Sequence, residues 1–230
     1  MREPQDSEEF INQQKAILAD NPDCANSHYN MGVKLLEQNR LDEAINAFQE
    51  AINNSGRMFE AWVNLGYIYF KKGDLKQVVY ANEKAIEIEP RYARGYANLG
   101  FAYLQMMESE KAIEALQKAI ELNPDIAQAK ANLINAYLQN DEVGKAIETG
   151  EELVQMAPDF SLGNNNLAVA YYNNEEYDKA IFYMDKAINQ GFEVHPQFRE
   201  ILEQHRKLNW HLFSITTNSL LIRLKQPSIT

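Results

Sequence analysis

The chain of 230 residues contains one cysteine, Cys24, so it can form neither an internal disulfide nor an all-cysteine metal site. It also lacks any run of 18 consecutive apolar residues, which excludes an ordinary transmembrane helix. The first nine residues do not contain the apolar core of a secretory signal. From these absences we expect a protein of the reducing cytoplasm with no membrane insertion.

Basic residues are scarce relative to acidic ones. The chain has 22 Lys and Arg against 33 Asp and Glu, and its formal net charge is −11. Because recognition of nucleic acid depends on clustered Lys and Arg, we expect no nucleic-acid partner. The apolar fraction of 45% is that of a folded protein and excludes wholesale disorder.

Patterns of catalytic and metal-binding residues are missing as well. The histidines stand at 28, 195, 205 and 211, and no pair has the four-residue spacing of a helical zinc site. Phosphate-binding and dinucleotide-binding glycine motifs are absent. The numerous carboxylates lie on predicted helices and are flanked by Lys and Arg, which is typical of a solvated helix face. We therefore expect no catalytic residues, no metal and no cofactor, and interpret the chain as a non-enzyme.

The sequence does contain a repeat of 34 residues. This spacing relates Pro90, Pro124 and Pro158, and it also relates several columns of Gly, Ala and Tyr. The tyrosine column consists of Tyr69, Tyr103, Tyr137 and Tyr171. Several columns in one register do not arise from composition, so the chain is a repeat array. Five full units run to about Val194, and they begin at Ala25, Phe59, Ala93, Ala127 and Ser161.

The spacing inside each unit is helical. In the second unit the residues at 62, 65, 66 and 69 follow one face of a helix, and those at 112, 116 and 119 in the third unit do the same for a second helix. Polar breaks at 71–74 and 139–142 separate the two helices of a unit, and the prolines lie between units. Each unit is therefore predicted to be a helical hairpin.

At these positions the sequence resembles the tetratricopeptide repeat family. The signature slots are filled in the second and third units by Trp62, Leu65, Gly66, Tyr69, Ala85 and Pro90, and by Tyr96, Leu99, Gly100, Tyr103, Ala112, Ala119 and Pro124. The resemblance covers about residues 25–194 and implies an all-α fold, a right-handed α-α superhelix or solenoid of five hairpins.

The fourth unit departs most from the family pattern. Lys130, Ile134, Gly150 and Leu153 replace the usual aromatic, small, bulky and alanine residues. A glycine inside a helix costs about 1 kcal/mol relative to alanine, so we expect local loosening or altered curvature there.

The ends of a repeat array need separate elements, because a stacked hairpin exposes an apolar face at each terminus. Residues 1–24 are predicted to form an N-terminal half-repeat helix, with Phe10 and Ile17 in the packing register. Residues 195–207 are predicted to form a C-terminal capping helix, with Phe198, Ile201 and Leu202 on one side.

Residues 208–230 form an atypical tail without a single acidic residue and with ten large apolar ones. Three interpretations are open. The tail is a β-hairpin turning near residues 217 and 218, an extended segment that docks on the array, or foreign or frameshifted sequence without an evolved role. We favour the last, a non-native or disordered tail, because the composition changes abruptly after a complete cap.

The face of the first helices that points away from their hairpin partners carries a recurrent amide. Position 6 of the unit is Asn in all five units, although only 23 of the 230 residues are Asn. These residues are Asn30, Asn64, Asn98, Asn132 and Asn166. An amide offers one acceptor and two donors, which match the C=O and N–H of a peptide unit.

This column is similar to the asparagine ladder in the repeat superhelix of O-linked N-acetylglucosamine transferase. The resemblance implies that the first helices line a concave groove and that the five Asn hold peptide backbone there. The alternative is that Asn persists through copying of a repeat template, or bonds to an adjacent helix.

Other positions on this face predict the character of the ligand. Tyr67, Phe101 and Asn135 occupy position 9, Phe70 occupies position 12 and Arg94 occupies position 2. Exposed aromatic rings can seat ligand side chains. Charged residues are rare on the face, so we expect a protein or peptide partner that is not strongly charged. The clamp of basic residues with which some family members bind acidic C-termini is not supported by the matching slots.

We therefore predict a non-catalytic protein–protein interaction adaptor that binds an extended or helical partner segment in its concave groove. The alternative function is a self-assembling scaffold, in which a terminal segment of one copy docks on a neighbouring copy.

Overall fold

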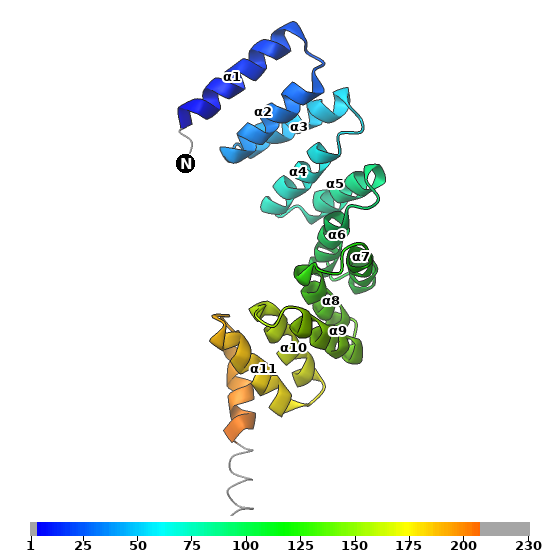
Figure 1. Cartoon of the computed structure of the whole chain (residues 1–230), viewed down its shortest axis with the longest axis vertical. Coiled ribbons are helices and arrows are strands. Elements are labelled where there is room, and N and C mark those ends of the chain that lie inside the picture. The colour runs from blue at the N-terminus through cyan, green and yellow to red at the C-terminus, as the bar shows by residue number, and fades with distance from the viewer. Residues whose placement is uncertain (1–3, 208–230) are drawn as a thin grey trace, which may run out of the picture. The chain divides into compact units, whose positions relative to one another are not determined.

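The structure is a computed structural model that describes residues 4–207, with side chains from residue 8. All regular secondary structure in this range is helical (Figure 1). Helix α1 (Pro4–Asp20) precedes five hairpins, and an unlabelled helix at 196–207 follows them. The hairpins are α2 (Ala25–Glu37) with α3 (Leu41–Asn54), α4 (Phe59–Lys71) with α5 (Leu75–Ile88), α6 (Ala93–Gln105) with α7 (Ser109–Leu122), α8 (Ala127–Gln139) with α9 (Val143–Met156), and α10 (Ser161–Asn173) with α11 (Tyr177–Asn189).

The first helix of every hairpin begins at the predicted first residue of its unit, and the predicted polar breaks fall between the two helices. The turn uses one backbone conformation throughout. Position 15 of each unit has a positive φ, between 58° and 73°, at Asn39, Gly73, Met107, Asp141 and Glu175. The next N–H donates to the carbonyl five residues before it, as Asp74 does to Tyr69 at 3.0 Å. This is a Schellman cap, which ends the first helix and reverses the chain even where the residue is not glycine.

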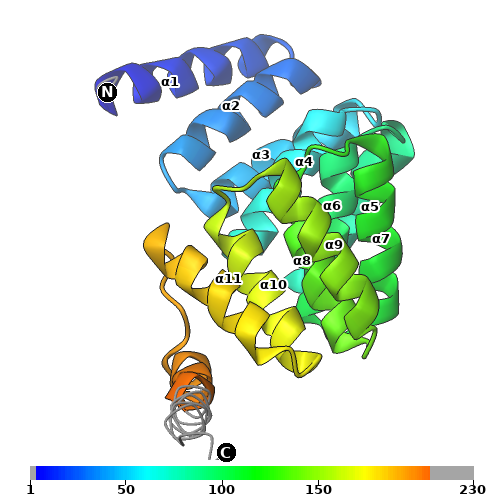
Figure 2. The same ribbon diagram turned by 60° about the horizontal axis from the view of Figure 1, so that its bottom comes forward.

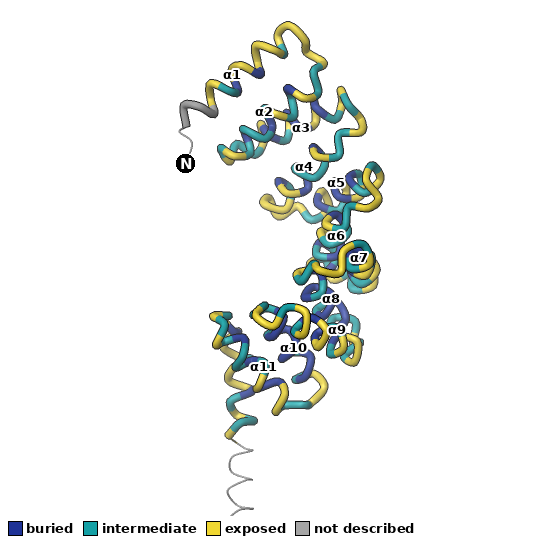
Figure 3. Tube along the Cα trace, in the orientation of Figure 1, coloured by how far each residue is buried: buried dark blue, intermediate teal, exposed yellow. Residues whose placement is uncertain are grey.

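The chain divides into two compact units, Met1–Asn132 and Leu133–Thr230, and the division falls within α8. In the first unit the buried core lies between successive hairpins and includes Ile11, Phe48, Leu65 and Ile68. In the second unit it includes Leu167, Tyr171, Met184 and Leu202. Figure 3 shows the buried positions recurring along each helix, which is the periodicity that the sequence predicted.

Glycines at position 8 let the two helices of a hairpin meet. A Cβ on Gly32 would lie 2.8 Å from Phe48, one on Gly66 would lie 2.9 Å from Asn82, and one on Gly100 would lie 2.4 Å from Leu116. Such distances are shorter than ordinary Cβ contacts, so a larger residue at any of these three positions would force the neighbouring side chain to move. Gly150 in the fourth repeat has a comparable reason, because its Cβ would lie 2.8 Å from Leu167 on α10. In the second unit this glycine therefore allows close packing of α9 on α10.

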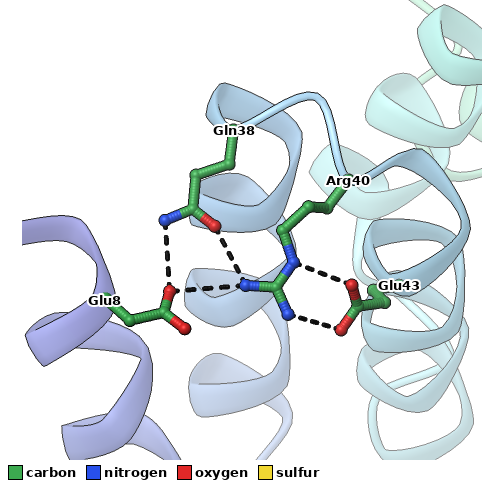
Figure 4. A network of polar contacts seen from close by, with 4 residues as sticks. All are labelled: Glu8, Gln38, Arg40 and Glu43. Atoms are coloured by element: carbon green, nitrogen blue, oxygen red, sulfur yellow. Dashed lines mark hydrogen bonds and ion pairs between the residues drawn. The ribbon is translucent and has the colours of Figure 1, made fainter. Parts of the chain in front are cut away.

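The N-terminal helix α1 lies beside α2 (Figure 2). Its buried side chains are Ile11 and Gln14, whereas Ile17 is 46% exposed. The register predicted for Ile17 was therefore wrong, because α1 has no preceding helix to cover that side. Glu8 accepts hydrogen bonds from Gln38 and Arg40, each at 3.3 Å, and Arg40 also forms a two-pronged ion pair with Glu43 (Figure 4). This network joins α1 to the first hairpin.

The helix at 196–207 covers the end of the second unit. Leu202 is fully buried, and the Phe198 ring meets the Tyr172 ring edge to face at 5.6 Å. Arg206 donates to Asp185 of α11 at 2.7 Å, whereas Ile201 remains 36% exposed. The three interpretations of residues 208–230 concern a segment outside the described residues.

Candidate functional site

A groove with a volume of about 510 Å³ opens on the first unit, between α4, α5, α6 and the beginning of α8. We call it the amide groove. It is lined by Val63, Asn64, Gly66, Tyr67, Phe70, Val78, Asn82, Tyr92, Ala97, Asn98, Phe101, Gln128 and Asn132. None of these residues is Asp, Glu, Lys or Arg, so the lining carries no formal charge at neutral pH.

Six of the ten predicted binding residues come together in this groove: Asn64, Asn98, Asn132, Tyr67, Phe70 and Phe101. The other four do not line it. Asn30 and Arg94 are exposed elsewhere on the first unit, and Asn135 is half-buried in the second. Asn166, also in the second unit, is only 4% exposed and accepts a hydrogen bond from Asn165. The Asn column thus contains both accessible and buried amides.

The apolar part of the groove consists of aromatic rings that are only half covered. Tyr67 is 52% exposed and Phe70 is 49% exposed. Phe70 of α4 meets Phe101 of α6 edge to face, with ring centroids 5.6 Å apart. The ammonium of Lys71 lies 5.6 Å from the centre of the Tyr67 ring. Large apolar side chains left this accessible beside a cavity are suited to contact with an apolar ligand group.

The polar part consists of carboxamides whose orientation is set by their partners. Asn64 donates from Nδ2 to the backbone carbonyl of Glu60 at 3.0 Å. A carbonyl can only accept, so the Asn64 amide must turn its nitrogen to its own helix and leave Oδ1 for other contacts. Asn132 is held the other way round, because its Oδ1 accepts from Gln128 Nε2 at 3.1 Å. The groove therefore offers an acceptor at Asn64, whereas Asn132 is only 7% exposed and its amide is hydrogen-bonded to Gln128.

Sequence reasoning missed Asn82, Tyr92 and Gln128, which also line the groove. Asn82 belongs to the second helix of its hairpin, whereas the sequence pattern predicts a groove formed by first helices. A signal was present, because the same position in the other repeats is Phe48, Leu116, Gly150 and Met184, none of which is polar in its side chain. Tyr92 precedes α6, and the pKa of its phenol is raised because the effect of burial outweighs that of the nearby Arg94 charge.

Within residues 4–207, no group of three or more His, Cys, Asp and Glu is placed to hold a metal ion. No helix there is both long and apolar enough to cross a membrane. The amide groove is the feature of the first unit in which predicted binding residues gather.

Stacked helical hairpins with a groove on the first helices define a helical-repeat protein of the kind that serves as an interaction adaptor. Models of the tetratricopeptide repeat match residues 34–73, 66–106, 93–126 and 163–190, more than half of the chain. The chain belongs to the tetratricopeptide repeat family. No curated protein sequence matches it.

Solved structures agree with the fold. A crystal structure of MamA is 28% identical, with a TM-score of 0.66, and the match covers 70% of this chain and 94% of MamA. A crystal structure of YrrB, described as a TPR protein with an unusual peptide-binding site, is 22% identical, with a TM-score of 0.69 over 84% of this chain and 97% of YrrB. PilF of Pseudomonas aeruginosa is 20% identical, with a TM-score of 0.67 over 87% and 91%. The predicted all-α repeat superhelix is confirmed.

Proposed function

We propose that this protein is a non-catalytic adaptor that binds an extended segment of a partner protein in the amide groove. The observation that carries the proposal is the juxtaposition of uncharged carboxamides with half-exposed aromatic rings in one cavity. Carboxamides bind the repeating C=O and N–H of any peptide backbone, and aromatic rings bind its apolar side chains. An uncharged lining favours a partner segment without a strong charge.

In this proposal Asn64, Asn98 and Asn132 bond to the partner's backbone, and Tyr67, Phe70 and Phe101 contact its side chains. Each satisfied hydrogen bond contributes about 0.5–1.5 kcal/mol, so useful affinity requires several contacts together. Asn30 and Arg94 are exposed and would extend the site along the first unit. The roles predicted for Asn135 and Asn166 in binding stay predictions. YrrB, a protein of the same fold, supports only the capacity of such a fold to hold a peptide.

We also propose that the protein resides in the cytoplasm. A chain with one cysteine cannot form an internal disulfide, so its stability does not depend on an oxidising compartment.

The proposal is tested by selecting phage-displayed random 12-residue peptides on the full chain and measuring the affinity of a synthetic selected peptide by calorimetry. We expect the double variant Asn64→Ala with Asn98→Ala to bind it at least tenfold more weakly. The matched control is Asn53→Ala with Asn54→Ala, two exposed residues of α3 outside the groove, which should bind as the wild type does. Equal binding by the groove variant, or selection of no peptide at all, would contradict the proposal.

A further inference from the structure

Asn82 is an anomaly in the repeat. It occupies position 24, where the other hairpins carry Phe48, Leu116, Gly150 and Met184, and its side chain is 1% exposed. A buried carboxamide in an apolar packing column is costly unless all its polar atoms are bonded. Such a departure from the packing pattern marks a position that serves another purpose.

Both ends of the Asn82 amide are hydrogen-bonded. Its Nδ2 donates to the backbone carbonyl of Val78 at 2.8 Å, and its Oδ1 accepts from Asn98 Nδ2 at 3.1 Å. The Val78 carbonyl can only accept, so Asn82 has to turn its nitrogen to that carbonyl and its oxygen to Asn98. Asn98 must in turn present its nitrogen to Asn82. One backbone carbonyl thereby determines the orientation of two amides in succession.

The Asn98 carboxamide is left with its oxygen available. Asn98 is exposed and lines the amide groove, and within residues 4–207 no hydrogen bond to its Oδ1 is formed. Asn64 occupies the same position in the preceding hairpin but has no counterpart of Asn82 to orient its amide. The equivalent residue, in the hairpin before that of Asn64, is Phe48, which has no amide. Asn64 Nδ2 donates instead to the Glu60 carbonyl of its own helix at 3.0 Å and to the Tyr29 hydroxyl at 3.4 Å. Both amides then direct an acceptor to the ligand, but Asn98 depends on a side chain of another helix for this.

We propose that Asn82 is a positioning and specificity-determining residue, which holds Asn98 Oδ1 as the acceptor for a backbone N–H of the bound segment. This rests on the proposed function of the amide groove. The site at Asn98 then requires an N–H donor from the partner, and it rejects a proline or any other unit without that proton.

The positioning step is tested first without a ligand, by NMR of the side-chain amide of Asn98. The variants are Asn82→Leu and Asn82→Met, which install residues that this column already carries at Leu116 and Met184. We expect both variants to shift the Asn98 amide resonances and to accelerate exchange of its protons by about tenfold. The control is Leu116→Met, a volume-conserving change in the same column that should leave these resonances in place. Unaltered Asn98 resonances in a folded Asn82→Leu protein would refute the proposal that Asn82 orients the Asn98 amide.

The specificity step uses a selected 12-residue peptide, resynthesised with one backbone N–H at a time replaced by N–CH₃. Against the wild type we expect methylation at one position to weaken binding at least tenfold. For the Asn98→Ala variant, the same methylation should weaken binding by less than about threefold, because this variant lacks the Asn98 Oδ1 acceptor. Asn82→Leu should bind the unmethylated peptide about fivefold more weakly than the wild type, and should have no further effect in the Asn98→Ala background.

The outcomes separate the two proposals. If Asn98→Ala weakens the peptide but Asn82→Leu does not, or if the two effects simply add, the positioning role of Asn82 is refuted and the proposed function stands. If Asn98→Ala and Phe70→Ala both bind the peptide as the wild type does, the groove is not the binding site and the proposed function fails.

Discussion

The rings of Phe70 and Phe101 meet edge to face at an interplanar angle of 72°, although they belong to the first helices of two successive hairpins. The contact does not enclose the pair, since Phe70 stays 49% exposed and Phe101 is only partly buried. A pair of aromatic rings that is held in place yet open to solvent is a preformed apolar contact surface beside the carboxamides of the amide groove.

The first prediction concerns this pair. Phe70→Ala should lower the affinity for a selected peptide about tenfold, because a half-exposed ring that is covered by a ligand contributes about 1–2 kcal/mol. The melting temperature should change little. Phe182→Ala is the matched control, since Phe182 is 61% exposed and contacts Tyr183 outside the groove. A loss of affinity that is equal in both variants would argue against a specific contact.

The second prediction concerns the helix contact at Gly100. A Cβ at this position would lie 2.4 Å from Leu116 Cγ and 3.2 Å from the Ala112 carbonyl oxygen, so Gly100→Ala should destabilise the fold by about 1–3 kcal/mol. Gly144→Ala in α9 is the control, because a Cβ there would meet no described atom within 4 Å. It should stabilise the helix by up to about 1 kcal/mol. Urea unfolding measures both, and changes of the same sign would refute the packing argument.

The third prediction concerns Asn164, which is fully buried on α10. Its Nδ2 donates to the Pro158 carbonyl at 3.1 Å and to Gln190 Oε1 at 2.9 Å, and so ties α10 to the end of α11. Asn164→Ala should cost about 1–3 kcal/mol of stability, since these acceptors lose a buried partner. Asn173→Ala removes an exposed amide of the same helix and should change stability by less than about 0.5 kcal/mol. Chemical denaturation that gives equal values would contradict this.

The fourth prediction concerns pH. The Arg40 guanidinium, chiefly through its hydrogen bonds, holds the pKa of Glu43 below its usual range. A carboxyl with a lowered pKa in the folded state contributes stability that is present above its unfolded pKa of about 4.3 and is lost as the pH falls through its folded pKa. The melting temperature should therefore fall further between pH 6 and pH 3 in the wild type than in Glu43→Gln. Parallel curves by circular dichroism would show that the Arg40–Glu43 pair has no part in acid sensitivity.

The fifth prediction separates the adaptor from the self-assembling scaffold. For an adaptor, the mass measured by light scattering should not change with concentration, either for the full chain or for a chain without residues 208–230. Growth in mass with concentration that disappears when these residues are deleted would favour assembly through a terminal segment.

The periodicity of the sequence was sufficient for the hairpins and their boundaries. A 34-residue spacing of Gly, Ala, Tyr and Pro reflects packing that is local to one hairpin and its neighbour, so each unit could be interpreted without knowledge of distant contacts. Because the side-chain direction in a helix follows from position alone, the same reasoning found six first-helix residues of the amide groove, although it missed Gln128 of α8.

The roles of individual amides could not be derived in that way. Asn98 and Asn166 occupy the same repeat position, yet one is exposed and the other is 4% exposed. Asn164, two residues earlier, carries buried hydrogen bonds of α10, and the only signal in the sequence was that it stands in the slot filled by Trp62 and Tyr96 in other units. Exposure depends on which neighbouring helix covers a side chain, and that neighbour differs from repeat to repeat.

The amino-acid sequence by itself determined the repeat, the family and the near-neutral face of the first helices, because these follow from the residue types at a fixed spacing. Only the tertiary structure decided which of the asparagines meet in one groove and which atom of each amide is left for a ligand. The physical reason is that a carboxamide has two different ends, and the choice between them is made by partners such as the Val78 carbonyl and Asn82, which reach Asn98 only after α5 and α6 have packed together.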